Sequence, residues 1–206
     1  MDDQSTWTMD DSARASRPGN TKVNPFLWIR HYPTWAVGYF ACLIGSLVLA
    51  LTLHWSLWIL FALMLGLNWF YWQRVKEHFL HGNVCPAIIV NLNPMMFAVL
   101  TDLSKGIGEY PAIKIIPKKF TTVLGKKPDL GARFPAVALY GMMHEDIPYW
   151  EEFDPRPLEF ATSDQKTIHG VASRISRDDW KELDEMLRKV PRPFQPGLYE
   201  LWQKRN

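Results

Sequence analysis

Two histidines and a cysteine near the middle of the chain have a spacing that resembles a metal site. His78, His81 and Cys85 form the pattern HxxHxxxC in the segment HFLHGNVC. Imidazole and thiolate groups bind Zn²⁺, but a structural zinc site needs four ligands, and no second cluster in the sequence supplies the fourth. We therefore predict no metal and no cofactor, with two histidines on a solvated helix and a small buried cysteine. A membrane-tethered enzyme or metal-binding protein that uses this region is the alternative.

A run of acidic residues, HEDIPYWEEFD at 144–154, is the second candidate for chemistry. Acid–base catalysis requires carboxyl groups whose surroundings push their pKa values apart. A dense acidic run in a loop is more typical of a solvated segment, in which Tyr149 and Trp150 pack locally. The two aromatic residues are also candidate contacts for a partner, because the run could serve as a docking strip for a basic protein. Catalysis by this loop belongs to the enzyme alternative.

The remaining short motifs do not indicate a known catalytic class. The segment SKGIGEYP at 104–111 lies between two predicted strands and does not open a helix, so it predicts a turn and not a dinucleotide-binding loop. The chain has no Walker motif and no GxSxG nucleophile elbow. We predict no catalytic residue and favour a non-enzymatic protein.

The charge distribution argues against nucleic acid and leaves a lipid surface open. The formal net charge is only +2, and the basic residues form no helical stripe with interleaved aromatics. The stretch 105–133 is nevertheless basic. It is either a solvated face or a surface for anionic headgroups, to which each cation contributes about 1 kcal/mol near the membrane. The candidate contacts within it are Lys118, Lys119, Lys126 and Lys127.

The elements that would position these residues begin with two long apolar segments. Residues 35–53 contain no charged side chain, and neither do residues 56–73. As one helix, 35–72 would be about 57 Å long, nearly twice the thickness of the hydrocarbon layer. We therefore predict a transmembrane hairpin with helices at about 35–53 and 56–73, which turns at His54-Trp55-Ser56. The absence of Gly and Pro from this turn is the main objection.

The flanking charges predict the orientation of this hairpin. Arginine, lysine and histidine residues precede the first helix and follow the second, whereas the turn contains no Lys or Arg. The positive-inside rule then places both termini in the cytoplasm of a multi-pass protein of the bacterial (inner) membrane. The polar residues 1–24 predict a disordered tail, and residues 73–84 continue the second helix out of the membrane. Two isolated cysteines fit a reducing compartment.

Small residues along the two helices predict a close helix–helix contact. They recur at spacings of three and four in the first helix, and one lies in the second. Such stripes let helices approach each other within a membrane. Packing within the hairpin is the first interpretation, and a surface for oligomerisation or for another membrane protein is the second. The residues are Gly38, Cys42, Gly45, Ser46 and Gly66.

Short apolar runs separated by turn residues follow from Cys85 to the C-terminus. The runs PAIIVNL and MFAVLTDL flank Asn93-Pro94, and AIKIIP, FTTVL, FPAVALYG, PLEFAT and TIHGVAS are further candidate strands. SRDDWKELDEMLRKVP predicts an amphipathic helix over 177–190, which begins after Ser176. The two PRP segments, 155–157 and 191–193, are expected to be loops that cover sheet edges.

The whole chain thus predicts a membrane-anchored α+β protein. An N-terminal two-helix transmembrane hairpin (25–84) would hold a small antiparallel β-rich domain (85–206), barrel-like or sandwich-like, with a C-terminal amphipathic helix. Its expected partners are the lipid bilayer and a protein partner or a second copy of itself, and no nucleic acid. We expect the cytoplasmic domain to bind protein partners or lipid headgroups, and an accessory subunit of a membrane complex is one form of this role. Tethering makes weak contacts sufficient, because it raises the local concentration of the domain.

Overall fold

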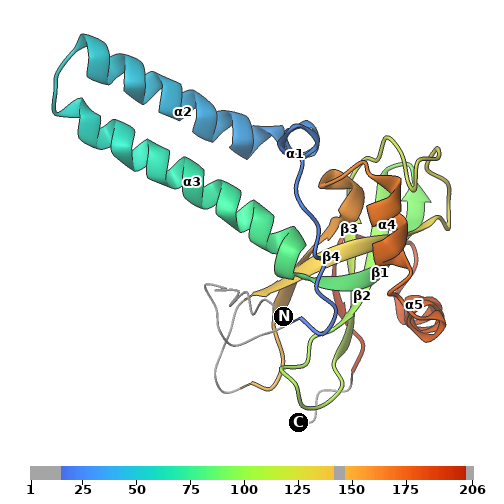
Figure 1. Ribbon diagram of the computed structural model, residues 1–206. Helices are drawn as coiled ribbons and strands as arrows, with labels where there is room; N and C mark the ends of the chain where they lie inside the picture. Colours follow the sequence, from blue (N-terminus) through green and yellow to red (C-terminus); the bar gives the residue numbers. More distant parts are fainter. Residues whose placement is uncertain (1–14, 142–146, 203–206) are drawn as a thin grey trace, which may run out of the picture.

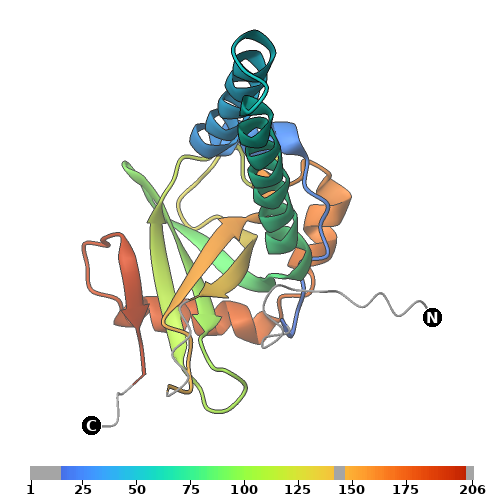
Figure 2. The ribbon, with the colours of Figure 1, turned by 90° about the vertical axis from the view of Figure 1, so that its left-hand side faces the viewer.

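A long helical hairpin projects from a β-rich domain in the computed structural model, which describes residues 15–141 and 147–202 (Figure 1). A short helix, α1 (Pro25–His31), precedes the two helices of the hairpin, α2 (Pro33–Thr52) and α3 (Leu57–His81). The far ends of α2 and α3 extend away from the sheet, and only the base of the hairpin reaches the domain (Figures 1 and 2).

The turn of the hairpin spans residues 53–56, where the sequence predicts it. His54 Nδ1 accepts a hydrogen bond from the Ser56 backbone N–H at 3.2 Å and lies 2.9 Å from the Ser56 hydroxyl. The backbone N–H of Leu57 also donates to the His54 carbonyl, at 3.0 Å. His54 therefore satisfies polar groups at the start of α3, which explains how a turn without Gly or Pro forms here.

The buried residues of the hairpin helices are small or polar ones such as Ala50, Ser46 and Asn68, and not the predicted glycines. Asn68 of α3 is buried and donates to the carbonyl of Tyr39 on α2 at 2.9 Å. Ser46 is buried in the same interface. Gly38, Cys42, Gly45 and Gly66 are all exposed, so packing within the hairpin, the first interpretation of these small residues, does not hold at these four positions.

The hairpin is apolar on its outside as well as in its interface. Sixteen of the 21 large hydrophobic side chains that are exposed among the described residues lie between positions 35 and 70. Of the helices in the described ranges, α2 alone is long and apolar enough to cross a membrane. A transmembrane hairpin of two such helices is therefore not supported by hydropathy. Asn68, the Trp and Tyr residues within 69–72 and the charges from Arg74 onward reduce the average hydropathy of α3.

The domain is built on one antiparallel sheet of six strands. Its order is β5-β4-β1-β2-β3-β6, so β1 lies near the middle and β5 and β6 form the edges. The β1–β2 hairpin turns at Asn93-Pro94, as predicted. The strands are β1 (Asn83–Leu92), β2 (Met95–Asp102), β3 (Pro111–Pro117), β4 (Arg133–Gly141), β5 (Glu152–Pro157) and β6 (Gly197–Glu200).

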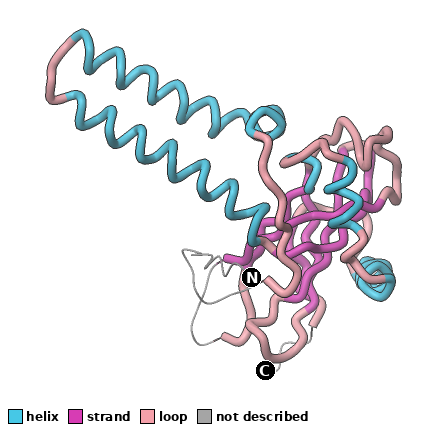
Figure 3. Tube along the Cα trace, in the orientation of Figure 1, coloured by secondary structure: helices cyan, strands magenta, loops and turns pink. Residues whose placement is uncertain are grey.

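The sheet curls until strands that are not neighbours in its order touch each other. Lys114 of β3 donates to the carbonyl of Phe153 on β5 at 2.6 Å and to the Glu152 carboxylate at 2.7 Å. Beyond β2, the Leu103 carbonyl accepts from the Trp150 backbone N–H at 2.7 Å. The result is a half-barrel (Figure 3), which agrees with the barrel-like form of the prediction and not with a two-sheet sandwich.

Apolar side chains fill the concave face of the half-barrel and cover its outer face. Inside, Phe97, Phe134 and Phe153 are almost completely buried in one cluster. Outside, the base of α3 and helix α4 (Gln165–Ala172) cover β1 and β4, whereas α5 (Arg177–Lys189) covers β2 and β3. The hairpin is therefore joined to the domain through core residues.

Several local predictions are corrected by these elements. TIHGVAS belongs to helix α4, which begins after Asp164, whose side chain accepts from the backbone N–H groups of Lys166 and Thr167. PLEFAT contains a 3-10 turn, η1 (Leu158–Phe160), and FTTVL forms no strand beyond a single bridge at Val123. The first PRP segment is no edge-covering loop, because it lies within β5. Helix α5 is confirmed, with a capping box between Ser176 and Asp179.

The described part of the predicted tail, residues 15–24, runs along the end of α3. The backbone N–H groups of Asn20 and Thr21 donate to the carbonyls of Leu80 and Phe79 at 3.0 and 3.1 Å. These carbonyls belong to the last turn of α3, where no further helical partner is available. The segment therefore caps the C-terminus of α3 and connects it to the sheet.

Candidate functional site

The histidines and the cysteine of the HxxHxxxC pattern do not converge, and the prediction of two solvated histidines is wrong for His78. His78 is buried, and its Nε2 donates to the Val137 carbonyl at 2.8 Å. Burial lowers the pKa of His78 to about 3 and raises that of the Cys85 thiol to about 11. His81 lies on the next turn of α3, and in the described part of the chain no three His, Cys, Asp or Glu side chains are grouped to hold a metal ion.

A polar cleft of about 630 Å³ opens where the ends of β1, β2 and β4 meet the end of α3. Segments far apart in the sequence build it, from Arg17 of the N-terminal segment to Glu182 of α5. The polar residues of this cleft are Ser16, Arg17, Arg74, Glu77, His81, Asn83, Thr101, Asp102, Ser104, Tyr140, Asp179 and Glu182.

A chain of hydrogen bonds crosses the floor of the polar cleft. Asn83 Nδ2 donates to the Tyr140 hydroxyl at 3.1 Å, and this hydroxyl lies 2.6 Å from the hydroxyl of Thr101. The Cys85 thiol donates to the same Thr101 oxygen at 3.5 Å. Burial raises the pKa of Tyr140, so the phenol stays protonated at neutral pH. The floor offers hydroxyl and amide groups for recognition, and its cysteine is held as a thiol that is a poor nucleophile.

An ion pair forms one wall of the polar cleft. Both terminal nitrogens of Arg17 donate to the Asp179 carboxylate, and this pairing is the main reason that the pKa of Asp179 is lowered. Desolvation, followed by nearby carboxylates, raises the pKa of Glu182. Among the described residues, the lining of the cleft has four carboxyl groups and two guanidinium groups. The lining therefore carries an excess of negative charge, which suits a polar ligand or a protein segment with a cationic group.

A second cavity of about 370 Å³ lies between the base of the hairpin and strands β4 and β5. We call it the junction pocket. Aromatic residues from all three N-terminal helices line it, together with arginine and carboxylate side chains. Its side chains include Trp28, Tyr32, Trp35, Tyr71, Arg74, His78, Glu152, Phe153, Asp154 and Arg156.

Arg156 is the central cation of the junction pocket. Its Nε and Nη2 pair with the Asp154 carboxylate at 2.9 and 2.6 Å. Its guanidinium carbon lies 4.8 Å from the ring centre of Trp28 and 5.5 Å from that of Tyr32, within the range of cation–π attraction. The indole N–H of Trp28 donates to the Tyr71 hydroxyl at 2.7 Å, which joins α1 to α3. The pocket is therefore held together by aromatic and charged contacts between the hairpin and the sheet.

The predicted lysine contacts fall in two different places. Lys118 reaches the base of the hairpin, because its Nζ donates to the His31 carbonyl at 2.8 Å and lies 3.8 Å from the ring centre of Tyr32. Lys119, Lys126 and Lys127 are exposed on the segment between β3 and β4. Of the four predicted lysine contacts, one is thus built into the junction and three lie on the surface.

The acidic run is only partly described. Residues 144–146 lie outside the described residues. Tyr149 packs against Tyr110 and Trp202, with ring centres 5.0 and 5.1 Å apart. Trp150 is a core residue, 5% exposed, and it lines the polar cleft.

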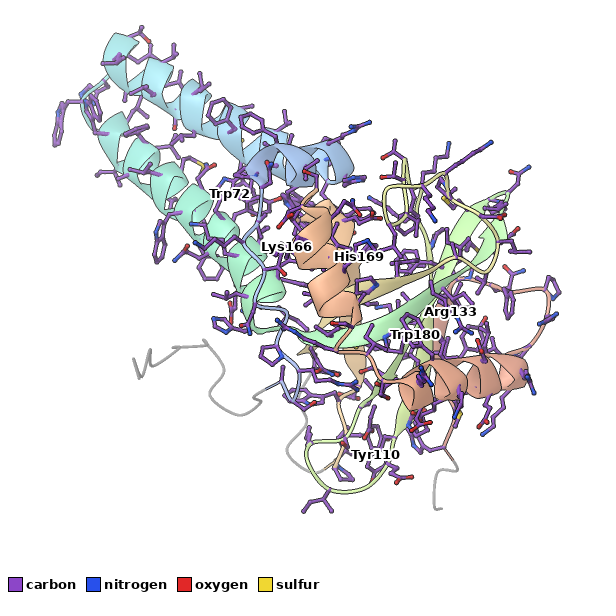
Figure 4. All side chains as sticks on the ribbon, turned by 45° about the vertical axis from the view of Figure 1, so that its right-hand side comes forward. Trp72, Tyr110, Arg133, Lys166, His169 and Trp180 are labelled. Atoms are coloured by element: carbon purple, nitrogen blue, oxygen red, sulfur yellow. The ribbon has the colours of Figure 1, made fainter. Side chains whose placement is uncertain are left out.

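Sequence reasoning missed the residues that both cavities depend on. Arg17 lies in the segment predicted to be a tail, and Arg156 lies in the PRP segment predicted to be a loop. The spacing of Asp154 and Arg156 carried a usable signal, because residues two apart on a strand share one face. No local pattern connects Arg17 with Asp179, which are 162 positions apart. Next to Asp179 in the first turn of α5, Trp180 lies beside Arg133 in a cation–π contact of 5.5 Å (Figure 4).

Comparisons with known proteins place the domain in a family and name no activity. No curated protein matches the chain. A solved structure described as a "putative membrane protein from Corynebacterium diphtheriae" aligns with 26% identity and a TM-score of 0.49, and covers 57% of this chain and 99% of that one. A family model described as "Protein of unknown function (DUF3239)" matches residues 72–191, from the base of α3 to the end of α5. Because this match covers more than half of the chain, the protein belongs to the DUF3239 family.

Proposed function

We propose that this protein is a non-enzymatic, membrane-anchored binding protein. The α2–α3 hairpin crosses the bacterial inner membrane as two antiparallel spans, and the DUF3239 domain lies in the cytoplasm, where it binds a partner. The observation that carries this proposal is the apolar outer surface of the hairpin, which projects away from the domain.

Water is a poor solvent for this surface. Exposed side chains such as Phe40, Leu51 and Ile59 are 59, 66 and 72% accessible. A large apolar side chain gains about 1.5–3 kcal/mol when it leaves water, so sixteen of them represent tens of kcal/mol. Lipid removes this cost without a protein partner. No Asp, Glu, Lys or Arg occurs from residue 31 to residue 73, which is consistent with insertion of both helices.

The dimensions of the hairpin are compatible with a bilayer. The 20 residues of α2 extend about 30 Å, the thickness of the hydrocarbon layer. The apolar part of α3, residues 57–72, extends about 24 Å and ends in Trp69, Phe70, Tyr71 and Trp72, which suit the membrane–water interface. Cations follow directly at Arg74 and Lys76, and the 53–56 turn has none. This asymmetry supports cytoplasmic termini.

The polar cleft supplies a recognition surface for the proposed role. It is the larger of the two cavities, and its excess of carboxyl groups favours a partner with a cationic segment. Tethering to a membrane keeps such a partner at a high local concentration, so modest contacts in the cleft are sufficient. The hairpin determines where binding takes place, and the cleft determines what is bound.

A topology experiment tests the anchor. Single cysteines are introduced by Trp55→Cys in the turn and Gln165→Cys on α4, in a Cys42→Ala/Cys85→Ala background. Intact cells are treated with a membrane-impermeant maleimide. We expect labelling at position 55 in intact cells and labelling at position 165 only after lysis. The two variants are matched controls for each other, because both introduced cysteines are exposed in the fold.

Extraction of the membranes at alkaline pH supplies the second readout. The protein should remain with the lipid pellet, as expected for an inserted hairpin. Release into the supernatant would refute insertion, and labelling of position 165 in intact cells would refute the proposed orientation.

An accessory-subunit role is a second candidate, favoured by the outward small residues of the hairpin. Apart from their chain neighbours and the nearby backbone of their own helix, Gly38, Gly45 and Gly66 have no described atom within 4 Å of the place that a Cβ would occupy. A neighbouring transmembrane helix could therefore approach closely at these positions. Purification in a mild detergent followed by mass spectrometry tests this role: a stoichiometric companion protein is expected, and a protein that runs alone as a monomer contradicts it.

A further inference from the structure

We infer that the junction pocket binds the phosphate group of a membrane phospholipid. The inference rests on the proposed membrane anchor and adds a ligand at a defined place. Trp35 belongs to the first turn of α2, and Tyr71 and Arg74 lie where the apolar part of α3 ends. With the hairpin in the bilayer, the pocket therefore lies at the level of the lipid headgroups.

The two arginines of the pocket retain hydrogen-bond donors for a phosphate. A guanidinium carries five N–H groups. Asp154 occupies Nε and Nη2 of Arg156, and Glu77 accepts from a single nitrogen of Arg74 at 3.1 Å. In the described part of the chain, Nη1 of Arg156 and two nitrogens of Arg74 thus remain for a ligand. Arginine donors are suited to phosphate, whose oxygens accept paired hydrogen bonds.

The other charges that face the pocket are already paired within the protein. The Glu152 carboxylate accepts from Lys114 at 2.7 Å, and Asp154 pairs with Arg156. His78 adds no charge, because burial keeps its ring neutral. Outside the pocket, Lys118 lies on the ring of Tyr32 and increases the positive potential at the base of the hairpin. The carboxylates therefore do not prevent the approach of an anion.

The surroundings favour a lipid phosphate over a soluble one. Trp35 lines the pocket and is also 67% exposed, so its ring connects the pocket with the apolar surface of the hairpin. A phospholipid whose phosphate occupies the pocket can lay its acyl chains along this surface. Free phosphate gains nothing from the apolar wall. Tyrosine and tryptophan side chains also favour this depth, because their rings are apolar and their N–H and O–H groups are polar.

Native mass spectrometry of the full-length protein, released from membranes or nanodiscs in a mild detergent, tests the inference. The wild type should retain one phospholipid per chain. Arg74→Gln and Arg156→Gln should each weaken retention about tenfold, the effect of one lost charged hydrogen bond. Arg133→Gln is the matched control, because Arg133 pairs with Asp184 of α5 and lies outside both cavities. Arg74 is half exposed, so its replacement leaves the core intact.

The outcomes separate the pocket from the anchor. Equal lipid retention by the wild type and both pocket variants, with all proteins still in the membrane fraction, would overturn the phosphate site and leave the anchor standing. Loss of the wild type from the membrane fraction would instead remove the anchor. Displacement of the lipid by millimolar inorganic phosphate or glycerol phosphate would assign the pocket to a soluble phosphate and also overturn the inference.

Discussion

Protonation of His78 should make the domain measurably less stable at mildly acidic pH. This side chain is 2% exposed, and its Nε2 donates to the Val137 carbonyl of β4. Burial lowers its pKa from 6.5 in the unfolded chain to about 3 in the folded protein. The neutral ring therefore contributes stability that is fully present above about pH 6.5 and is lost as the pH falls toward 3. At pH 5, 1.5 units below the unfolded pKa, the loss is about 2 kcal/mol.

The comparison of wild type with His78→Gln isolates this contribution. Glutamine can donate to the same carbonyl and does not titrate. His31, whose pKa burial lowers to about 4, adds to the acid sensitivity of both proteins and cancels in the comparison. Pulse proteolysis in urea, with the full-length protein in detergent, gives the free energy of unfolding at pH 7 and pH 5. We expect the wild type to lose about 2 kcal/mol more than His78→Gln between these pH values.

A core variant supplies the control for a general loss of stability. Val75→Ala removes a buried side chain about one turn before His78 on α3, so it should reduce stability at both pH values and keep the acid sensitivity of the wild type. Equal pH dependence in wild type and His78→Gln would refute the argument, because it would mean that the His78 ring is not held neutral by the fold.

Three other predictions concern the stability and reactivity of the domain. Ser176→Ala should cost about 1 kcal/mol in urea unfolding because it removes the hydroxyl that accepts from the Asp179 backbone N–H at 3.0 Å; an unchanged midpoint would contradict the capping role. Leu183→Ala should cost about 2–5 kcal/mol, since this side chain of α5 is fully buried against the sheet, and an effect below 1 kcal/mol would mean that α5 is not docked there. Cys85 should resist iodoacetamide at pH 8 until the protein is unfolded, because burial raises the pKa of its thiol to about 11; rapid alkylation of the native protein, detected by mass spectrometry of the Cys85 peptide, would contradict this.

Local sequence patterns were enough to predict the hairpin, its turn, four of the strands and helix α5. Each of these elements depends on residues close together in the chain. The uncharged segments predict the helices, the Asn93-Pro94 turn predicts the β1–β2 pair, and Ser176 with Asp179 predicts the start of α5. The run TIHGVAS of helix α4 is short and rich in β-branched residues, so by itself it predicts a strand. Asp164, an N-cap two residues before Lys166, was the signal that could have corrected it.

The tertiary structure decided which side chains meet. The rotation of α2 against α3 follows from Asn68 and its bond to Tyr39, and it turns Gly38 and Gly45 outward. The curl of the sheet brings Lys114 to Glu152, and the return of the chain brings Arg17 to Asp179. Both cavities depend on such distant contacts. The periodicity of apolar residues in the sequence shows which segments form helices or strands and which face of each is apolar. It does not show which faces pack against each other, and this packing determines where the two cavities form.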